Sequence, residues 1–261
     1  MKTVKLGSKG DDVVALQKAL DITADGVFGP KTETAVKSFQ KGKGLVADGI
    51  VGARTWAALE IAKTANSKCV DPSVVYLPLS VHVSKLAGRS IKYLAIHYTA
   101  GSSSAPGRAR AVKHVFENRQ ASADFAVDDA EMVQFNPDLD NYYCWAVGDK
   151  KSATSIADAT NRNTISIEIC STLRKGTATV PNHEGWEFTE AALANAARLA
   201  KILMRKYNIP IERVVRHYDI SGKVCPGIRG WNNAPLYTKE GKKTANKNNS
   251  EAWLNFKSRL V

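Results

Sequence analysis

The first sixty residues carry apolar side chains at the spacing of helices. Apolar residues three or four positions apart indicate an amphipathic helix. Two helices are expected over about residues 11–20 and 30–41, and a short third one carries Trp56 and Leu59. Pro30 suits the first position of the second helix. The pattern predicts a small all-α three-helix domain.

The same segment contains an internal repeat. Residues 24–32, Ala-Asp-Gly-Val-Phe-Gly-Pro-Lys-Thr, recur as residues 47–55, Ala-Asp-Gly-Ile-Val-Gly-Ala-Arg-Thr. In each copy Asp-Gly predicts a turn, an apolar pair anchors it, and the second glycine leads into a helix. A repeat of this kind constrains the architecture, so both copies are expected to fold alike.

Beyond about residue 75 the pattern changes to short apolar strands that alternate with helices. This alternation predicts an α/β domain with a mixed central β-sheet flanked by helices. Between the two patterns the sequence has no strong periodicity. We therefore expect a domain at residues 1–60, a linker at 61–75 and the α/β domain at 76–261.

Three segments of the α/β domain are expected to be strands that present polar side chains. Along Tyr93–His97, residues 94 and 96 point one way and His97 the other. Along Thr164–Cys170, three isoleucines share one face, and Glu168 lies on the other. Val214–Arg216 is the strand that leads to His217. Further on, Thr189 is the expected N-cap of a long helix that ends at about Lys206.

Two of these strands end in histidine, and Cys225 follows His217 by eight residues. His97, His217 and Cys225 are ligand types that Zn²⁺ prefers, and three protein ligands leave a fourth position for water. If the segments meet in space, the chain is a zinc hydrolase. Each residue also has an ordinary alternative: a packed or surface histidine, or an inert buried thiol.

The amino-acid composition indicates which classes of binding partner to expect. Lys and Arg number 37 against 25 Asp and Glu, a net charge of +12. This excess predicts affinity for polyanions, but the cations are spread along the chain, so no dedicated nucleic-acid binding is expected. No apolar run approaches the roughly 18 residues of a membrane span. The first residues lack the apolar region of a secretory signal.

Residues 1–60 resemble the peptidoglycan-binding domain found on many cell-wall enzymes. The matching features are Leu6-Gly7 followed by Gly10-Asp11, then Leu16-Gln17, the two Asp-Gly-x-x-Gly turns and Phe39-Gln40. The resemblance implies binding to bacterial peptidoglycan. The alternative is a generic three-helix bundle that only caps the enzyme.

Residues about 75–245 resemble the zinc-dependent N-acetylmuramoyl-L-alanine amidases, the type shared by phage endolysins and peptidoglycan recognition proteins. The matching segments are residues 96–101, 122–125, 145–148, 163–168, 217–219 and 223–226. The resemblance implies that His97, His217 and Cys225 bind Zn²⁺. Many relatives have histidine where this chain has Asp124, so that position is left outside the catalytic set.

The resemblance also implies two catalytic residues. Glu168 would be the general base close to the metal, and Lys223 would help stabilise the oxyanion. The ordinary alternatives are a salt bridge for Glu168 and a solvated side chain for Lys223. Tyr98, Trp145 and Trp186 are candidates for the lining of a substrate groove, with the core as the alternative.

Together these observations predict a peptidoglycan hydrolase that cleaves the amide between N-acetylmuramic acid and L-alanine. The expected context is a monomeric phage endolysin, made in the host cytoplasm and acting on the cell wall after release. Two alternatives stay open. One is a non-catalytic peptidoglycan recognition protein, and the other is a zinc peptidase that cuts within the stem peptide.

Overall fold

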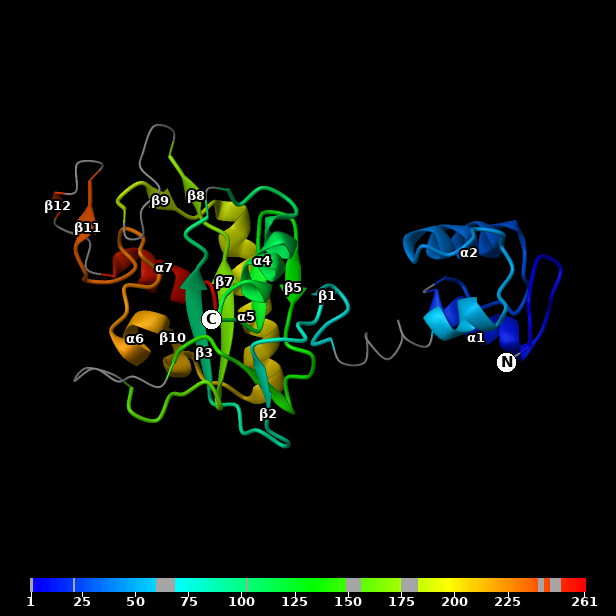
Figure 1. Cartoon of the computed structure of the whole chain (residues 1–261), viewed down its shortest axis with the longest axis horizontal. Coiled ribbons are helices and arrows are strands. Elements are labelled where there is room, and N and C mark those ends of the chain that lie inside the picture. Colours follow the sequence, from blue (N-terminus) through cyan, green and yellow to red (C-terminus); the bar gives the residue numbers. More distant parts are fainter. Residues whose placement is uncertain are drawn as a thin grey trace. The chain divides into compact units, whose positions relative to one another are not determined.

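The computed structural model describes residues 2–20, 22–59, 69–101, 103–148, 156–174, 183–238, 242–244 and 250–261. The chain divides into two compact units, Met1–Ser67 and Lys68–Val261 (Figure 1). Most of the expected linker lies outside the described residues, and the domain limits stay a prediction. Val70, near the start of the second unit, is tied to that unit because its N–H donates to Gln134 Oε1 at 2.9 Å.

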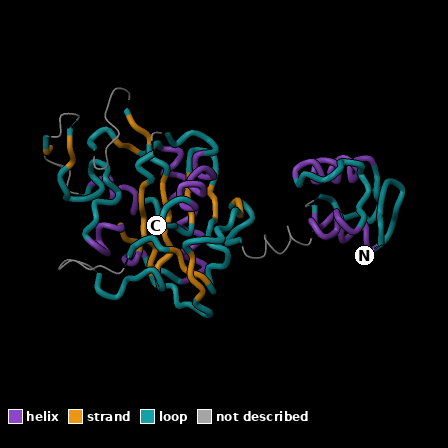
Figure 2. The backbone as a smooth tube through the Cα atoms, viewed as in Figure 1, coloured by secondary structure: helices purple, strands orange, loops and turns teal. Residues whose placement is uncertain are grey.

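The first unit is built of helices and loops (Figure 2). Helix α1 spans Asp11–Ala19 and α2 spans Pro30–Gly42, while residues 53–59 are also helical. The predicted three-helix fold is therefore confirmed. Its core consists of the buried residues Val4, Val13, Leu16, Phe28, Val36, Val51, Trp56 and Leu59.

A buried glutamine holds each copy of the repeat. Gln17 Nε2 donates to Asp25 Oδ1 at 2.7 Å and to Thr32 Oγ1 at 3.1 Å, and its Oε1 accepts from Gly26 N at 2.9 Å. Gln40 makes the same three bonds, to Asp48 at 2.8 Å, Thr55 at 3.2 Å and Gly49 at 2.9 Å. Both amides are buried, so these bonds satisfy groups that would otherwise be costly to desolvate.

The second unit contains a six-stranded sheet in the order β1-β5-β4-β7-β3-β10. Only the β4–β5 pair is antiparallel, so the sheet is mixed, as predicted. The strands are β1 (Val75–Tyr76), β3 (Tyr93–Tyr98), β4 (Phe125–Val127), β5 (Met132–Gln134), β7 (Thr164–Ile169) and β10 (Val214–Arg216). Three two-stranded pairs accompany it: β2 (Val83–Lys85) with β6 (Tyr142–Cys144), β8 (Thr172–Leu173) with β9 (Trp186–Glu187), and β11 (Leu236–Tyr237) with β12 (Lys243–Thr244).

Two helices cover opposite faces of this sheet (Figure 1). Helix α5 (Glu190–Tyr207) packs on the side chains of Leu94, Ile96 and the three isoleucines of β7. Helix α4 (Arg108–Glu117) packs on Ala126 of β4. The residues on either side of Ala126 in this strand, Phe125 and Val127, point to the α5 side. Because side chains alternate along a strand, His97 and Glu168 face the α4 side.

The remaining helices lie near the C-terminal end of the chain. They are the short 3₁₀ helix Ile211–Arg213, α6 (His217–Ser221) and α7 (Glu251–Ser258). As expected, Thr189 caps α5, because its Oγ1 accepts from Ala192 N at 3.2 Å. None of the helices in the described part of the chain has the length and apolar character that a membrane crossing requires.

Candidate functional site

Parallel pairing brings the predicted strand ends together. Strand β3 pairs with β7 in a register that places His97 opposite Glu168. Strand β10 pairs with β3 on its other side, and His217 directly follows β10 as the first residue of α6. The carboxyl ends of parallel strands meet at one edge of a sheet, which is where both histidines and the glutamate lie.

Cys225 reaches the histidines from the loop that follows α6. Tyr218 N donates to the Cys225 carbonyl at 2.9 Å, which ties this loop to the start of the helix. Cys225 Sγ lies 3.7 Å from His97 Nδ1. His97, His217 and Cys225 each offer one donor atom, and the three atoms lie within 4.8 Å of one another. The three side chains can therefore hold a metal ion.

An ion pair beside His217 fixes the start of α6. Arg216 Nε donates to Asp219 Oδ2 at 2.9 Å, and the Arg216 backbone N–H donates to the same oxygen at 2.8 Å. The guanidinium also donates to the Trp231 carbonyl at 2.6 Å. These bonds connect the end of β10 with α6 and with the loop that contains Trp231, so they stabilise the backbone next to His217.

Burial favours the neutral form of all three candidate ligands. It lowers the pKa of His97 well below its usual value and that of His217 to about 4, and the charge of Lys223 acts in the same direction. A neutral imidazole is the form that binds metals. Burial raises the pKa of the Cys225 thiol. A bound cation would reverse that last effect, because a coordinating thiol loses its proton.

Glu168 lies beside the three residues but outside their cluster. Its Oε1 is 4.0 Å from His97 Nδ1. Its Oε2 has no hydrogen-bond partner among the described residues. Burial raises the pKa of Glu168 to about 8, against the attraction of Lys223. A buried carboxyl group without a strong partner is typical of a functional site.

These side chains lie in a groove of about 620 Å³. Lys223, which is exposed, lines the same groove, as do Tyr98 and Trp145. Trp186 does not, because its side chain is buried in the core on the α5 side, so that candidate was wrong. The catalytic roles of Glu168 and Lys223 stay predictions.

Two cations that line the groove were not predicted from the sequence. Arg108 and Arg119 line it from the two ends of the α4 segment. Exposed basic residues at the ends of a helix normally indicate a solvated surface, so nothing in the local pattern distinguishes Arg108 and Arg119 from other surface cations.

Asp124 belongs to a separate buried network. Its carboxylate accepts from Ser166 N at 2.8 Å and from Asn136 Nδ2 at 2.6 Å, and it lies 3.7 Å from Arg89 Nη1. Burial raises the pKa of Asp124, against the attraction of Arg89. Arg89 in turn donates to the Thr164 carbonyl at 2.7 Å. Asp124, which directly precedes β4, thus connects this strand with Ser166 of β7 and with Asn136 just after β5. It is not part of the metal cluster.

Comparison with known families agrees with this geometry. Residues 87–228, which contain all three candidate ligands and Glu168, match the family described as N-acetylmuramoyl-L-alanine amidase. The chain belongs to this amidase family. Residues 9–59 match a family described as a peptidoglycan binding domain, which covers both copies of the repeat in the first unit.

Relatives of the amidase domain include two amidases of Bacillus subtilis. The chain is 36% identical over 135 residues to N-acetylmuramoyl-L-alanine amidase CwlH of Bacillus subtilis, a match that covers 51% of this chain and 46% of the relative. It is 33% identical over 138 residues to the amidase XlyB of the same organism, covering 52% and 37%. The chain therefore spans less than half the length of these curated relatives. Among solved structures, the catalytic domain of XlyA aligns with 26% identity and a TM-score of 0.47, covering 72% of this chain and 99% of that one.

Proposed function

We propose that this protein is a zinc-dependent peptidoglycan hydrolase that cleaves the amide bond between N-acetylmuramic acid and L-alanine. The observation that carries the proposal is the buried cluster of His97, His217 and Cys225 beside Glu168, in a groove of an amidase-family domain. A phage endolysin that acts on the host wall after release is the context we propose for it.

The residues fit Zn²⁺ in donor type and in spacing. Zinc bonds of about 2.0–2.1 Å to nitrogen and 2.3 Å to sulfur place the two atoms about 3.5 Å apart on a tetrahedral ion. The observed separation of Cys225 Sγ and His97 Nδ1 is 3.7 Å. His217 Nδ1 is buried without a partner among the described residues, while the backbone of Val147 hydrogen-bonds to the same ring. A backbone bond of this kind orients a histidine that ligates a metal.

The reaction that we propose uses the groove as follows. Zn²⁺, when bound, would supply a Lewis acid that polarises the carbonyl and makes water more acidic. Glu168, in the charged form that a bound cation would favour, accepts the proton of the attacking water and then gives it to the leaving amine of L-alanine. Lys223, at the groove wall, contributes positive charge where the oxyanion develops. Burial of His97 and His217 keeps water away from the cluster except through the groove.

The other candidate functions lack a supporting observation. A non-catalytic recognition protein needs no metal, yet the cysteine of the candidate ligand set is present and lies beside both histidines. A zinc peptidase that cuts within the stem peptide would use the same donor types, and only the family match favours the amide at the sugar.

Digestion of purified sacculi tests the proposal directly. The zinc-loaded full chain should release stem peptides with a free L-alanine amine and leave glycan strands that carry unsubstituted lactyl groups. Mass spectrometry of both fractions identifies these ends. Chelation should stop the release and Zn²⁺ should restore it. New ends within the stem peptide would instead identify a peptidase, and an unchanged sacculus would support the recognition protein.

We also expect the first unit to hold the enzyme on the wall without taking part in the reaction. A fragment of residues 69–261 should bind sacculi about 10-fold or more weakly than the full chain, because tethering a second binding module raises retention on a polymer. Pull-down on sacculi measures this effect. The same fragment should cleave a small soluble muropeptide as fast as the full chain. If a folded fragment loses that soluble activity, the first unit contributes to the active site.

A further inference from the structure

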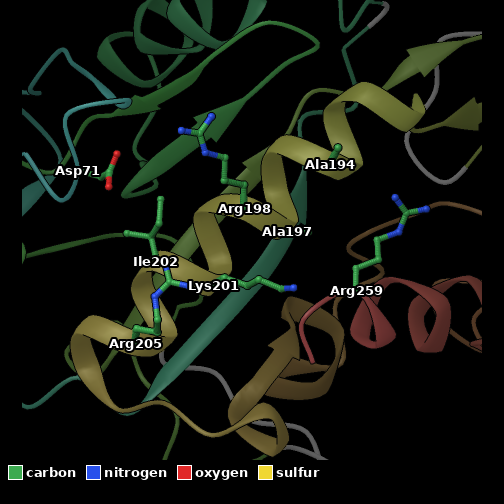
Figure 3. A pocket seen from close by; sticks show the side chains of 8 residues that line it. All are labelled: Asp71, Ala194, Ala197, Arg198, Lys201, Ile202, Arg205 and Arg259. Carbon is green, nitrogen blue, oxygen red and sulfur yellow. The ribbon is translucent and has the colours of Figure 1, made fainter.

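A second pocket, of about 450 Å³, lies on the exposed side of α5. Arg198, Lys201 and Arg205 project from this helix around it, and Arg259 approaches from the end of α7 (Figure 3). Asp71 is the acidic residue of its lining. Four cations and one carboxylate therefore line a hollow that the amidase reaction does not use.

The pocket is separate from the catalytic groove. The other side of α5 is buried through residues such as Ala196, Leu199 and Leu203, which pack on one face of the sheet. His97 and Glu168 face the opposite side of that sheet, where α4 lies. The whole sheet and helix α5 therefore stand between the two sites.

The spacing of the helix cations is unfavourable for the isolated protein. Arg198, Lys201 and Arg205 follow one another at intervals of three and four residues, which places like charges side by side on one helical face. Arg205 lies in the last turn, where the helix dipole stabilises a cation. Arg198 is in the middle of the helix and gains nothing from the dipole. An anionic ligand would offset this repulsion.

Two of the four cations are already engaged. Arg259 forms an ion pair with Glu190, and Lys201 Nζ donates to the Val261 carbonyl at 3.3 Å. Within the described ranges, Arg198 and Arg205 have neither a hydrogen bond nor an ion pair within 4.0 Å. Hydrogen bonds from Ser73, with a smaller contribution from these two guanidinium groups, lower the pKa of Asp71. The two arginines are thus free to bind a ligand.

We propose that this pocket binds the phosphate groups of an anionic cell-wall polymer built from phosphodiester repeats. The planar fork of arginine matches phosphate oxygens and stays charged at every working pH. The stripe from Arg198 to Arg205 spans about 10 Å along the helix, long enough for more than one anionic group. The wall as the source of the polymer rests on the proposed function. The net charge of +12 would favour the same encounter.

The test measures binding of poly(glycerol phosphate) chains to the zinc-loaded full protein by calorimetry at low salt. Arg198→Gln/Arg205→Gln should weaken binding about 10-fold or more. It should also make the negative slope of log K against log salt shallower by about 1–2, since each phosphate contact releases counterions. The matched control is Lys92→Gln/Arg162→Gln, which removes two exposed cations outside both pockets. The affinity of this control for the polymer should stay within about twofold of the wild type, because neither residue contacts phosphate in the proposed complex. Arg198→Lys keeps the charge without the fork and should give an intermediate affinity.

Several outcomes would overturn the proposal. Equal weakening in both double variants would mean that only net charge matters. Binding of poly-glutamate or of single-stranded DNA as tightly as the phosphodiester polymer would mean a general polyanion surface. Thermal unfolding of each variant checks that it is folded. Cleavage of a soluble muropeptide is measured in parallel and should be the same in all variants, so a failure of the amidase proposal is seen separately from a failure of this one.

Discussion

Replacing Cys225 with serine should empty the metal site and abolish cleavage of sacculi. A serine hydroxyl keeps its proton near neutral pH and is a much poorer ligand than a thiolate for Zn²⁺. His97 and His217 would remain, but two ligands in a groove open to water hold the ion weakly. The loss of activity should exceed the roughly 10–100-fold effect typical of removing an outer partner of a metal ligand. Metal analysis and turnover are measured on the same preparation.

Cys69→Ser is the matched control for this variant. The Cys69 thiol donates to the Val74 carbonyl at 3.2 Å and lies outside the candidate cluster. A serine hydroxyl can make the same bond, so metal content and activity should both be retained. If the two variants behave alike, or if Cys225→Ser keeps its zinc, Cys225 is not a ligand and the proposed centre is wrong.

The sequence predicted which side chains share a strand face, but not which strands are neighbours. Alternation along residues 164–170 separates Glu168 from the isoleucines, and the same rule separates His97 from Leu94 and Ile96. Only the register of β3 on β7 places Glu168 opposite His97. That pairing joins segments about seventy residues apart, and it depends on long-range packing that no local pattern contains.

The role of Asp124 also depends on long-range contacts that could not be predicted from the sequence. Its partners Arg89, Asn136 and Ser166 come from three separate segments. Nothing near Asp124 in the sequence indicates that its charge would be buried and matched. The sequence therefore identified the position as a departure from the family, and the structure supplies its role inside the sheet.

The glutamines of the first unit are a case where a signal existed. Gln17 lies on the apolar face of its helix, and Gln40 follows it at the same offset as the two Asp-Gly turns. A polar residue repeated on a buried face implies a buried partner. The turns were predicted from their own residues. Predicting the hydrogen bonds that hold these turns would have required combining the repeat with the helical spacing of the glutamines.

Glu168→Gln should leave zinc bound and lower turnover by about 10²–10⁴-fold, the usual effect of losing a general base. Glutamine has the same shape but cannot accept the proton of the attacking water. Because burial already favours the uncharged carboxyl group, the amide should fold as stably as the wild type. Glu187→Gln, an exposed change on β9 outside the groove, is the control and should have normal turnover. Zinc content and steady-state kinetics on soluble muropeptide decide the outcome. Loss of zinc would make Glu168 a ligand, whereas near-normal turnover would remove it from the reaction and leave the proton transfer to another group of the groove.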